Sequence, residues 1–586
     1  MNKEWSLDVL YKGYDDPAFI EDFKQLEEVC NEINLFSKDL ASAVSAEDNK
    51  VIRAIQLYEK MTLKMMNLYF YLELRQTTNT TDSETTNYIN KVQKLDCSIT
   101  KSLAVIDRYF SRITDIGTVV KSHKELSEYQ YFLTQKKEDA KYLLSDDVEE
   151  AISKMNLSAG SAWSRLQEYL TSTVEVDYDG KKVTLSEIRN LAYSGDKAVR
   201  KAAYEAELAC YEKIKDSVCF SLNSIKSQVN TISEMRGYGS VLDMTLNQAH
   251  MKKSTLDAMF TALKEYLPRF HEYLRRKASL LGYENGLPWF EMFAPMGKEN
   301  TTFTVEEARD YLLKHFSAFS KDIADIIEEA FANSWIDFYP RKGKVGGAFC
   351  ENIPQKKQSR VLTNFDGKLT SVVTLAHELG HAYHGSMIQD HAPLNWDYSM
   401  PVAETASTFN ETVIMNAAIN EADGEEKLAL IESQLQDITQ IMCDIYSRYL
   451  FESAVVERAK TDFMSADELS EMMLQAQKEA YGDGLDPEFL HPYMWVNKSH
   501  YYSEALSFYN FPYAFGGLFA RGLYEKYKEE GDSFMPKYRA LLRATTVASV
   551  EDAAMEAGVN LEDPEFFRKS LASYDELITE FLELTK

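Results

Sequence analysis

Two histidines and a glutamate stand at the spacing of a metal site on a helix. His377, Glu378 and His381 belong to the sequence His-Glu-Leu-Gly-His, which follows the apolar run 372–376. Residues four apart on a helix share one face, so the two imidazoles can bind a single Zn²⁺. Glu378, one position after the first histidine, can then reach a water on that metal. The spacing therefore predicts a zinc hydrolase, and metallopeptidases are the usual bearers of this motif.

A catalytic zinc usually has three protein ligands and a water, so the third ligand must come from outside this helix. Glu404, Ser407 and Glu411 lie at i, i+3 and i+7 and share a helical face. Two carboxylates on one face are costly unless a cation or a histidine faces them. We therefore expect Glu404 to bind the metal and Glu411 to hold a ligand histidine. Other side chains downstream of the motif are weaker candidates for the third ligand: Asp390, His391 and Asp397.

The elements that position these residues are expected to be mainly helical. The chain has 586 residues but only 13 Pro and 24 Gly, which favours long helices and few linkers. Amphipathic helical periodicity covers 15–170, and 174–185 alternates around an Asp-Gly turn, which predicts a β-hairpin. We place a soft boundary near residue 190, with 1–190 as an N-terminal helical lobe and 191–586 as the catalytic zinc-peptidase domain.

The segment directly before the metal helix has a different character. Residues 335–370 are β-prone and punctuated by glycine, which predicts a small β element beside that helix. The segment lacks the G-x-x-x-x-G-K-[ST] spacing of a phosphate loop. An edge strand here could pair with an extended peptide by β-augmentation, and a plain structural hairpin is an equal alternative.

Composition and charge limit the kinds of molecule that this protein is expected to bind. The net charge is −28 with a pI near 4.9, and an acidic surface repels nucleic acid and anionic membranes. The six cysteines are scattered without a C-x-x-C pair, the N-terminus shows no signal peptide, and no apolar run reaches membrane-spanning length. We therefore expect a cytoplasmic protein that binds neither nucleic acid nor membrane. The sequence leaves the oligomeric state open.

These motifs together resemble the oligoendopeptidase F family of zinc metallopeptidases, which is related to thimet oligopeptidase and neurolysin. The resemblance covers residues 190–586, while the N-terminal region matches only in length and helical character. The segments that carry it are HELGH at 377–381, ETASTFNE at 404–411, KVGGAF at 344–349, RGY at 236–238 and the aromatic stretch 500–516.

The family resemblance implies a two-lobed, largely α-helical protein with a deep substrate channel and zinc at the channel floor. It also implies that short peptides are cut while folded proteins are excluded. His500 and one of Tyr502 or Tyr509 are then expected to donate hydrogen bonds to the oxyanion of the transition state. Phe511 stands where relatives often have tyrosine, so which hydroxyl contacts the substrate is left open.

We therefore predict a zinc-dependent endopeptidase that hydrolyses internal bonds of short oligopeptides. One Zn²⁺ per chain would be held by His377, His381 and Glu404, and Glu378 would act as general base on the attacking water. One alternative is a zinc carboxypeptidase, which needs a cation for the terminal carboxylate of its substrate. A second alternative is a helical peptide-binding protein with a structural metal, which normally has four protein ligands, often cysteines.

Overall fold

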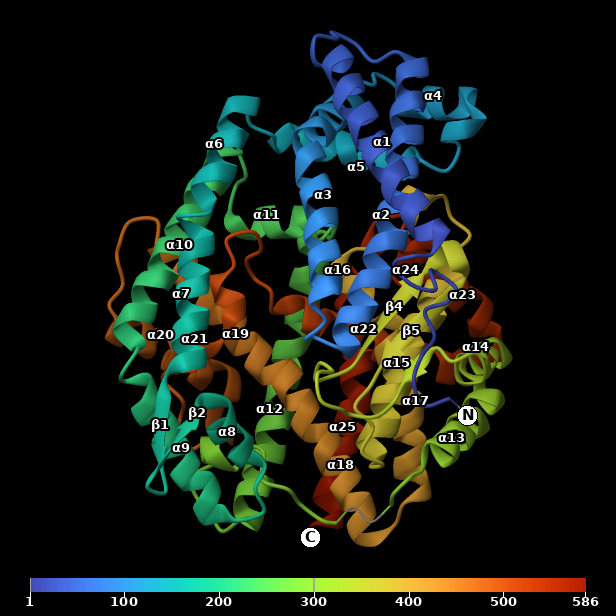
Figure 1. Cartoon of the computed structure of the whole chain (residues 1–586). Helices are drawn as coiled ribbons and strands as arrows, with labels where there is room; N and C mark the ends of the chain where they lie inside the picture. The colour runs from blue at the N-terminus through green and yellow to red at the C-terminus, as the bar shows by residue number, and fades with distance from the viewer. Residues whose placement is uncertain (1, 299–300) are drawn as a thin grey trace. The chain divides into compact units, whose positions relative to one another are not determined.

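Helices make up most of the computed structural model, which describes residues 2–298 and 301–586 (Figure 1). The expected mainly α fold is therefore confirmed. The chain gathers into two compact units, and each unit draws on three segments of the sequence. The functional division expected at residue 190 stays a prediction. Unit 1 comprises Met1–Tyr142, Thr301–Ala417 and Lys526–Val559, and unit 2 comprises Leu143–Asn300, Ala418–Glu525 and Asn560–Lys586.

Unit 1 contains the N-terminal helices and the elements around the metal motif. Its helices are α1 (Pro17–Ala41), α2 (Asp48–Thr78), α3 (Ser83–Phe110), α4 (Ile116–Ser122), α5 (Gln130–Asp139), α13 (Val305–Phe319), α14 (Lys321–Ala332), α15 (Leu369–Ile388), α16 (Met400–Ala403), α23 (Met535–Ala544), α24 (Val550–Glu556) and most of α17 (Thr405–Glu421).

Unit 2 contains the helices that follow in the middle and near the end of the chain. They are α6 (Asp146–Asn156), α7 (Gly160–Thr173), α8 (Leu185–Asn190), α9 (Lys197–Tyr211), α10 (Lys215–Met235), α11 (Val241–Gln248), α12 (Lys253–Leu280), α18 (Gly424–Thr439), α19 (Ile445–Arg458), α20 (Ala466–Tyr481), α21 (Met494–Asn497), α25 (Pro564–Leu584) and most of α22 (Phe511–Glu530). The predicted hairpin is also here, as β1 (Glu175–Tyr178) paired antiparallel with β2 (Lys181–Thr184).

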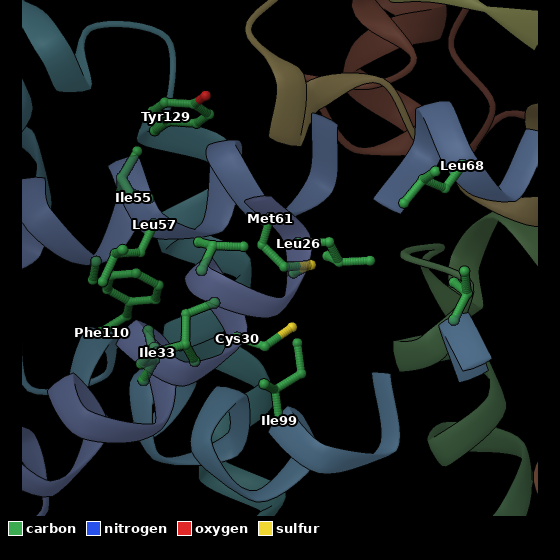
Figure 2. Close-up of a cluster of buried hydrophobic side chains, with 14 of the residues drawn as sticks. Leu26, Cys30, Ile33, Ile55, Leu57, Met61, Leu68, Ile99, Phe110 and Tyr129 are labelled. Carbon is green, nitrogen blue, oxygen red and sulfur yellow. The ribbon is translucent and has the colours of Figure 1, made fainter. Parts of the chain in front are cut away.

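The core of the N-terminal part of unit 1 lies among α1, α2 and α3 (Figure 2). Leu26 and Ile33 on α1 are buried together with Ile55 on α2 and Ile99 and Phe110 on α3. Along α1 the buried residues recur every three or four positions, which is the spacing of one face of a helix. Each such side chain contributes about 1.5–3 kcal/mol when it leaves water. The amphipathic pattern in the sequence therefore predicts these helices correctly.

A three-stranded sheet precedes the metal helix, as the glycine-punctuated segment predicts. The strand order is β3 (Ile336–Asp337), β5 (Gln358–Leu362), β4 (Phe349–Ile353), with β3 parallel and β4 antiparallel to β5. β4 and β5 pack against α15, beside which they are drawn in Figure 1. β4 lies at the edge of the sheet, so one side of its backbone has no strand partner among the described residues. Pairing of this edge with a peptide stays a prediction.

None of the described helices is long and apolar enough to cross a membrane.

Candidate metal centre

The two histidines of the motif lie on α15, a helix that is buried on almost all sides. Apolar side chains fill its length, from Val372 and Leu375 before the motif to Ile388 at its end. A helix that is apolar all round needs neighbours on every face. The ring centroids of His377 and His381 lie 5.0 Å apart, as expected for residues one turn apart on one helical face.

Glu404 reaches both histidines from the junction between α16 and α17. Its Oε2 lies 3.2 Å from Nε2 of His377 and 3.3 Å from Nε2 of His381. The hydroxyl of Ser407 donates to the same carboxylate oxygen at 2.7 Å, which fixes the orientation of the carboxylate. One possible ligand atom from each of the two histidines and Glu404 lies within 4.8 Å of the others. Two imidazole nitrogens and a carboxylate oxygen form a donor set that suits zinc.

A glycine within the motif lets α15 and α17 approach each other closely. A Cβ at Gly380 would come within 2.5 Å of the carbonyl oxygen of Ala406 and 2.6 Å of Cα of Ser407. Both atoms belong to the backbone of α17 and cannot swing away as a flexible side chain does. The close approach holds the start of α17, and with it Glu404, against the face of α15 that carries the histidines.

Glu411 contacts the other ring nitrogen of His377. Its Oε2 lies 3.2 Å from Nδ1, and an ionised carboxylate only accepts hydrogen bonds, so Nδ1 carries a proton. In the neutral tautomer, Nε2 of His377 then presents a lone pair to the carboxylate of Glu404. Two acceptors 3.2 Å apart repel each other unless a proton or a metal ion lies between them. The residues present therefore fit a bound divalent cation.

The pKa values of this group point to the same need for positive charge. Burial alone would lower the pKa of His377, but hydrogen bonds to Glu404 and Glu411 outweigh burial and raise it to about 10. Burial would raise the pKa of Glu404, but its hydrogen bonds and charge interactions with His377 and His381 hold it far below its usual range. The carboxylates around His377 thus favour a positive charge at this point, which a proton or a metal ion can supply.

Glu378 lies beside the group and is almost completely buried. Its side chain is 6 % exposed, and burial raises the pKa of its carboxyl while the charges of His377 and His381 offset part of that effect. Cys350 of β4 interacts electrostatically with Glu378, which places the edge strand near this carboxyl. A carboxyl with a raised pKa suits a group that must accept and release a proton near neutral pH.

The weaker ligand candidates are not part of the group. Asp390 forms an ion pair with Lys357 at 2.6 Å, and Nε2 of His391 lies 2.9 Å from the carbonyl oxygen of Arg543. Asp397 lines a separate cavity of unit 1. The one cluster of metal-ligand type among the described residues is the His377, His381 and Glu404 group.

His384 stacks on Tyr398, a pairing that no motif in the sequence indicates. Their rings lie 4.3 Å apart and nearly parallel, and Nε2 of His384 lies 2.8 Å from the hydroxyl of Thr545. Burial lowers the pKa of His384 to about 3, so this histidine stays neutral. No spacing in the sequence could have found the pair, because Tyr398 lies in a loop after α15.

The expected oxyanion donors lie in unit 2, and they differ in their hydrogen-bond and ring contacts. His500 and Tyr509 make an edge-to-face ring contact at 4.8 Å, and His500 stacks on Tyr513 at 5.9 Å. Tyr502 is fully buried, and its hydroxyl donates to the carbonyl oxygen of Trp495 at 2.9 Å. The hydroxyl of Tyr502 therefore already has a partner, which favours Tyr509 as a donor. Their catalytic roles stay predictions.

The loop that presents Tyr509 is fixed by a buried ion pair. Glu452 accepts hydrogen bonds from the backbone N–H of Phe508 at 3.0 Å and from Nδ2 of Asn510 at 2.8 Å. The ammonium of Lys226 lies 2.6 Å from the same carboxylate, and both charged side chains are buried. Phe508 adopts a left-handed backbone conformation with φ 55°, which is unfavourable for a bulky residue. Backbone strain of this kind persists only where surrounding contacts hold it, and it is concentrated at functional sites.

Comparison with known proteins places the fold among oligopeptidases. The chain is 22% identical to oligopeptidase PepF of Bacillus subtilis over 592 residues, which covers 99% of this chain and 87% of the relative. The solved oligoendopeptidase-F of Enterococcus faecium matches with a TM-score of 0.72 and 18% identity, over 97% of this chain and 98% of that one. A solved protein of Chlamydophila abortus, described as a peptidase, matches with a TM-score of 0.84 and 18% identity, over 99% and 98%.

Two family models match the sequence. The model of oligopeptidase F matches residues 114–175, and the model of peptidase family M3 matches residues 190–573. The helical fold, the His–His–Glu group and these matches define the class as a metallo-oligopeptidase. The chain belongs to peptidase family M3. The resemblance inferred from the motifs is thereby confirmed.

Proposed function

We propose that this metallo-oligopeptidase is a zinc-dependent endopeptidase that hydrolyses internal bonds of short oligopeptides. The observation that carries the proposal is the convergence of three ligand atoms within 4.8 Å, from His377, His381 and Glu404. A set of two imidazoles and one carboxylate leaves a fourth position open, as catalytic zinc sites require. When bound, one Zn²⁺ per chain would lower the pKa of a water and polarise the scissile carbonyl.

The protein side chains supply the proton transfers and the orientation. Glu378 takes the proton of the attacking water and passes it to the leaving amine, as its buried, raised-pKa carboxyl allows. Glu411 holds His377 in the tautomer whose Nε2 is free to bind a metal. His500 and Tyr509 donate hydrogen bonds to the oxyanion that develops on the substrate, with Tyr502 as the second candidate.

Two features of the site support an endopeptidase over the alternatives. A structural metal normally has four protein ligands, whereas the group found among the described residues has three. A carboxypeptidase needs a cation near the metal for the terminal carboxylate. Among the residues that the structure describes, Glu404 and Glu411 form ion pairs only with His377 and His381. These observations favour an endopeptidase. We further propose a cytoplasmic location and substrates of about ten residues, with no nucleic acid or membrane partner.

The test uses an internally quenched peptide of about ten residues, incubated with and without a chelator that is later replaced by Zn²⁺. We expect internal cleavage, seen by product masses, that the chelator abolishes and zinc restores. Release of single C-terminal residues would favour the carboxypeptidase alternative. A long unfolded chain such as casein serves as the size control and should survive; its efficient digestion would contradict the oligopeptide proposal.

A further inference from the structure

A cavity of about 500 Å³ lies in unit 1 beside the metal helix. β4, the end of α15 and the segment after α15 form part of its wall, and side chains of α2 and α5 line another part. The volume is sufficient for one long side chain and several waters. Nothing in the proposed mechanism uses this cavity.

Residues in the wall of this cavity lie close to residues of the candidate metal centre in the same unit. Asn352, in its wall, donates from Nδ2 to the carbonyl oxygen of His381 at 3.2 Å. Gly385, also in the wall, follows His381 by one helical turn, which is about 6 Å along the axis. Tyr398 lines the cavity and interacts electrostatically with Glu404. The wall of the cavity therefore lies next to the helix that carries the two histidines.

The cavity has a negative wall. The described side chains that line it include the carboxyls of Glu351 and Asp397, but no lysine, arginine or histidine. Burial and the negative charge of nearby Glu73 raise the pKa of Glu351 to about 7. None of the described residues that line the cavity offers the Glu351 carboxyl a positive charge, and a cation placed next to this carboxyl would favour its charged form. The cavity is thus suited to a positively charged group.

Aromatic side chains also line the cavity and could contact a cation. Phe70, Trp396 and Tyr398 line the cavity together with Tyr58 and Phe132. Cations are attracted to the faces of such rings, most strongly where water is excluded. The ammonium of Lys136 already lies 5.5 Å from the ring centre of Phe132 and 5.9 Å from that of Tyr58. Lys136 thus already contacts these two rings, and Phe70, Trp396 and Tyr398 are the rings left to meet a further cation.

We propose that this cavity is a specificity subsite that takes a lysine or arginine side chain of the peptide substrate, close to the scissile bond. The inference rests on the proposed function, because it assigns a substrate class to that same site. Glu351 supplies the negative charge, Asp397 adds to it, and the rings surround the aliphatic stem and the charged head. Peptides that carry a cation at the matching position are preferred over peptides with a neutral side chain of equal length.

The experiment compares internally quenched nonapeptides that differ at one position on either side of the cleaved bond. Lysine, norleucine or glutamate is placed at each position in turn, and product masses identify the bond cut. At one position we expect lysine to give a kcat/KM about tenfold above norleucine, the size expected for one charge-assisted contact. Glu351→Gln should lower this lysine-to-norleucine ratio toward one. Asp390→Asn removes the same charge from a surface ion pair with Lys357 and should keep the ratio.

Every outcome of this experiment either supports or overturns the proposed subsite. Absence of a lysine preference at every position, or an unchanged ratio in Glu351→Gln, overturns the subsite. If Glu351→Gln fails to fold by circular dichroism, Asp397→Asn takes its place, and the wild-type ratio alone still decides whether a preference exists. Chelator-sensitive cleavage of the norleucine peptide tests the proposed function separately, so loss of the subsite and loss of the enzyme are distinguishable.

Discussion

At the residue scale, the metal centre depends on side chains that hold one another. His377 lies between two carboxylates, Glu404 at Nε2 and Glu411 at Nδ1, each at 3.2 Å. Ser407 in turn orients Glu404. Loss of Glu404 and loss of Glu411 should therefore have different effects, because only Glu404 lies where it can bind the proposed metal.

Glu404→Gln and Glu411→Gln form a matched pair of substitutions. We expect Glu404→Gln to lose most of its zinc, because an amide oxygen is a poor ligand beside two imidazoles. Glu411→Gln should keep a metal but bind it about 10–100-fold more weakly, as loss of a partner that orients a ligand histidine does. The measurement is the zinc dissociation constant against a competing chelator. Equal affinity of the two variants would contradict the assignment of the two roles.

The two tyrosines of unit 2 should also respond differently. The hydroxyl of Tyr502 is buried and donates to the carbonyl oxygen of Trp495, so Tyr502→Phe should cost about 1 kcal/mol of stability and little in kcat. Tyr509→Phe should lower kcat and kcat/KM together, by about tenfold or more, if its hydroxyl contacts the oxyanion. Steady-state kinetics with one quenched peptide measures both. A larger loss of kcat in Tyr502→Phe than in Tyr509→Phe would identify Tyr502 as the oxyanion donor instead.

Glu351 predicts a pH dependence of stability with a definite sign. Its pKa is raised from 4.5 to about 7 in the folded chain, because of burial and the charge of Glu73. The folded state therefore binds more protons than the unfolded state between these values, and this group destabilises the fold as pH rises through that window. Glu351→Gln should be the more stable protein at pH 8, by about 3 kcal/mol at most. Denaturation midpoints at pH 5 and 8 measure this; an equal difference at both pH values would contradict it.

At the element scale, the contact between α15 and α17 determines the geometry of the centre. Gly380, the glycine of the motif, has no room for a methyl group, because the backbone of α17 lies within 2.6 Å of the position that a Cβ would take. Gly517 of α22 differs, because a Cβ there would first meet the side chain of Ile441 at an ordinary 3.4 Å. The two glycines therefore provide a direct test of helix approach.

Gly380→Ala should push the helices apart and weaken the site. We expect a loss of about 1–3 kcal/mol in stability, as overpacking does, with a lower affinity for zinc because Glu404 moves with α17. Gly517→Ala should be neutral or slightly stabilising, since alanine is the better helix former. Thermal midpoints and zinc titrations of the two variants give the comparison. A Gly380→Ala protein with unchanged zinc affinity would show that the close approach does not set the site.

The sequence predicts these elements only where a local pattern exists. The amphipathic helices of the N-terminal region and the hairpin around Asp179 and Gly180 follow from periodicity and turn chemistry. The stacking of Tyr398 on His384 and the ion pair of Lys226 with Glu452 do not, because they join positions far apart in the chain. Such pairs are set by tertiary packing, which no local spacing encodes.

At the scale of the whole molecule, the compact units do not follow the order of the chain. Unit 1 combines an N-terminal, a central and a C-terminal segment, so a boundary sought from composition shifts along the sequence cannot locate it. The three proposed metal ligands, by contrast, lie between positions 377 and 404 and are predicted by spacing and carboxylate chemistry. Family M3 membership then links that group to peptide hydrolysis.

The activity of Glu378→Gln at full zinc content tests whether Glu378 is the general base of a zinc peptidase. Glutamine keeps the size of the side chain but cannot take a proton from water. We expect the variant to hold one zinc per chain, like the wild type, and to lose about 10²–10⁴ in kcat on the quenched peptide, the usual contribution of a general base. A variant with one zinc and wild-type kcat would show that Glu378 is not the base.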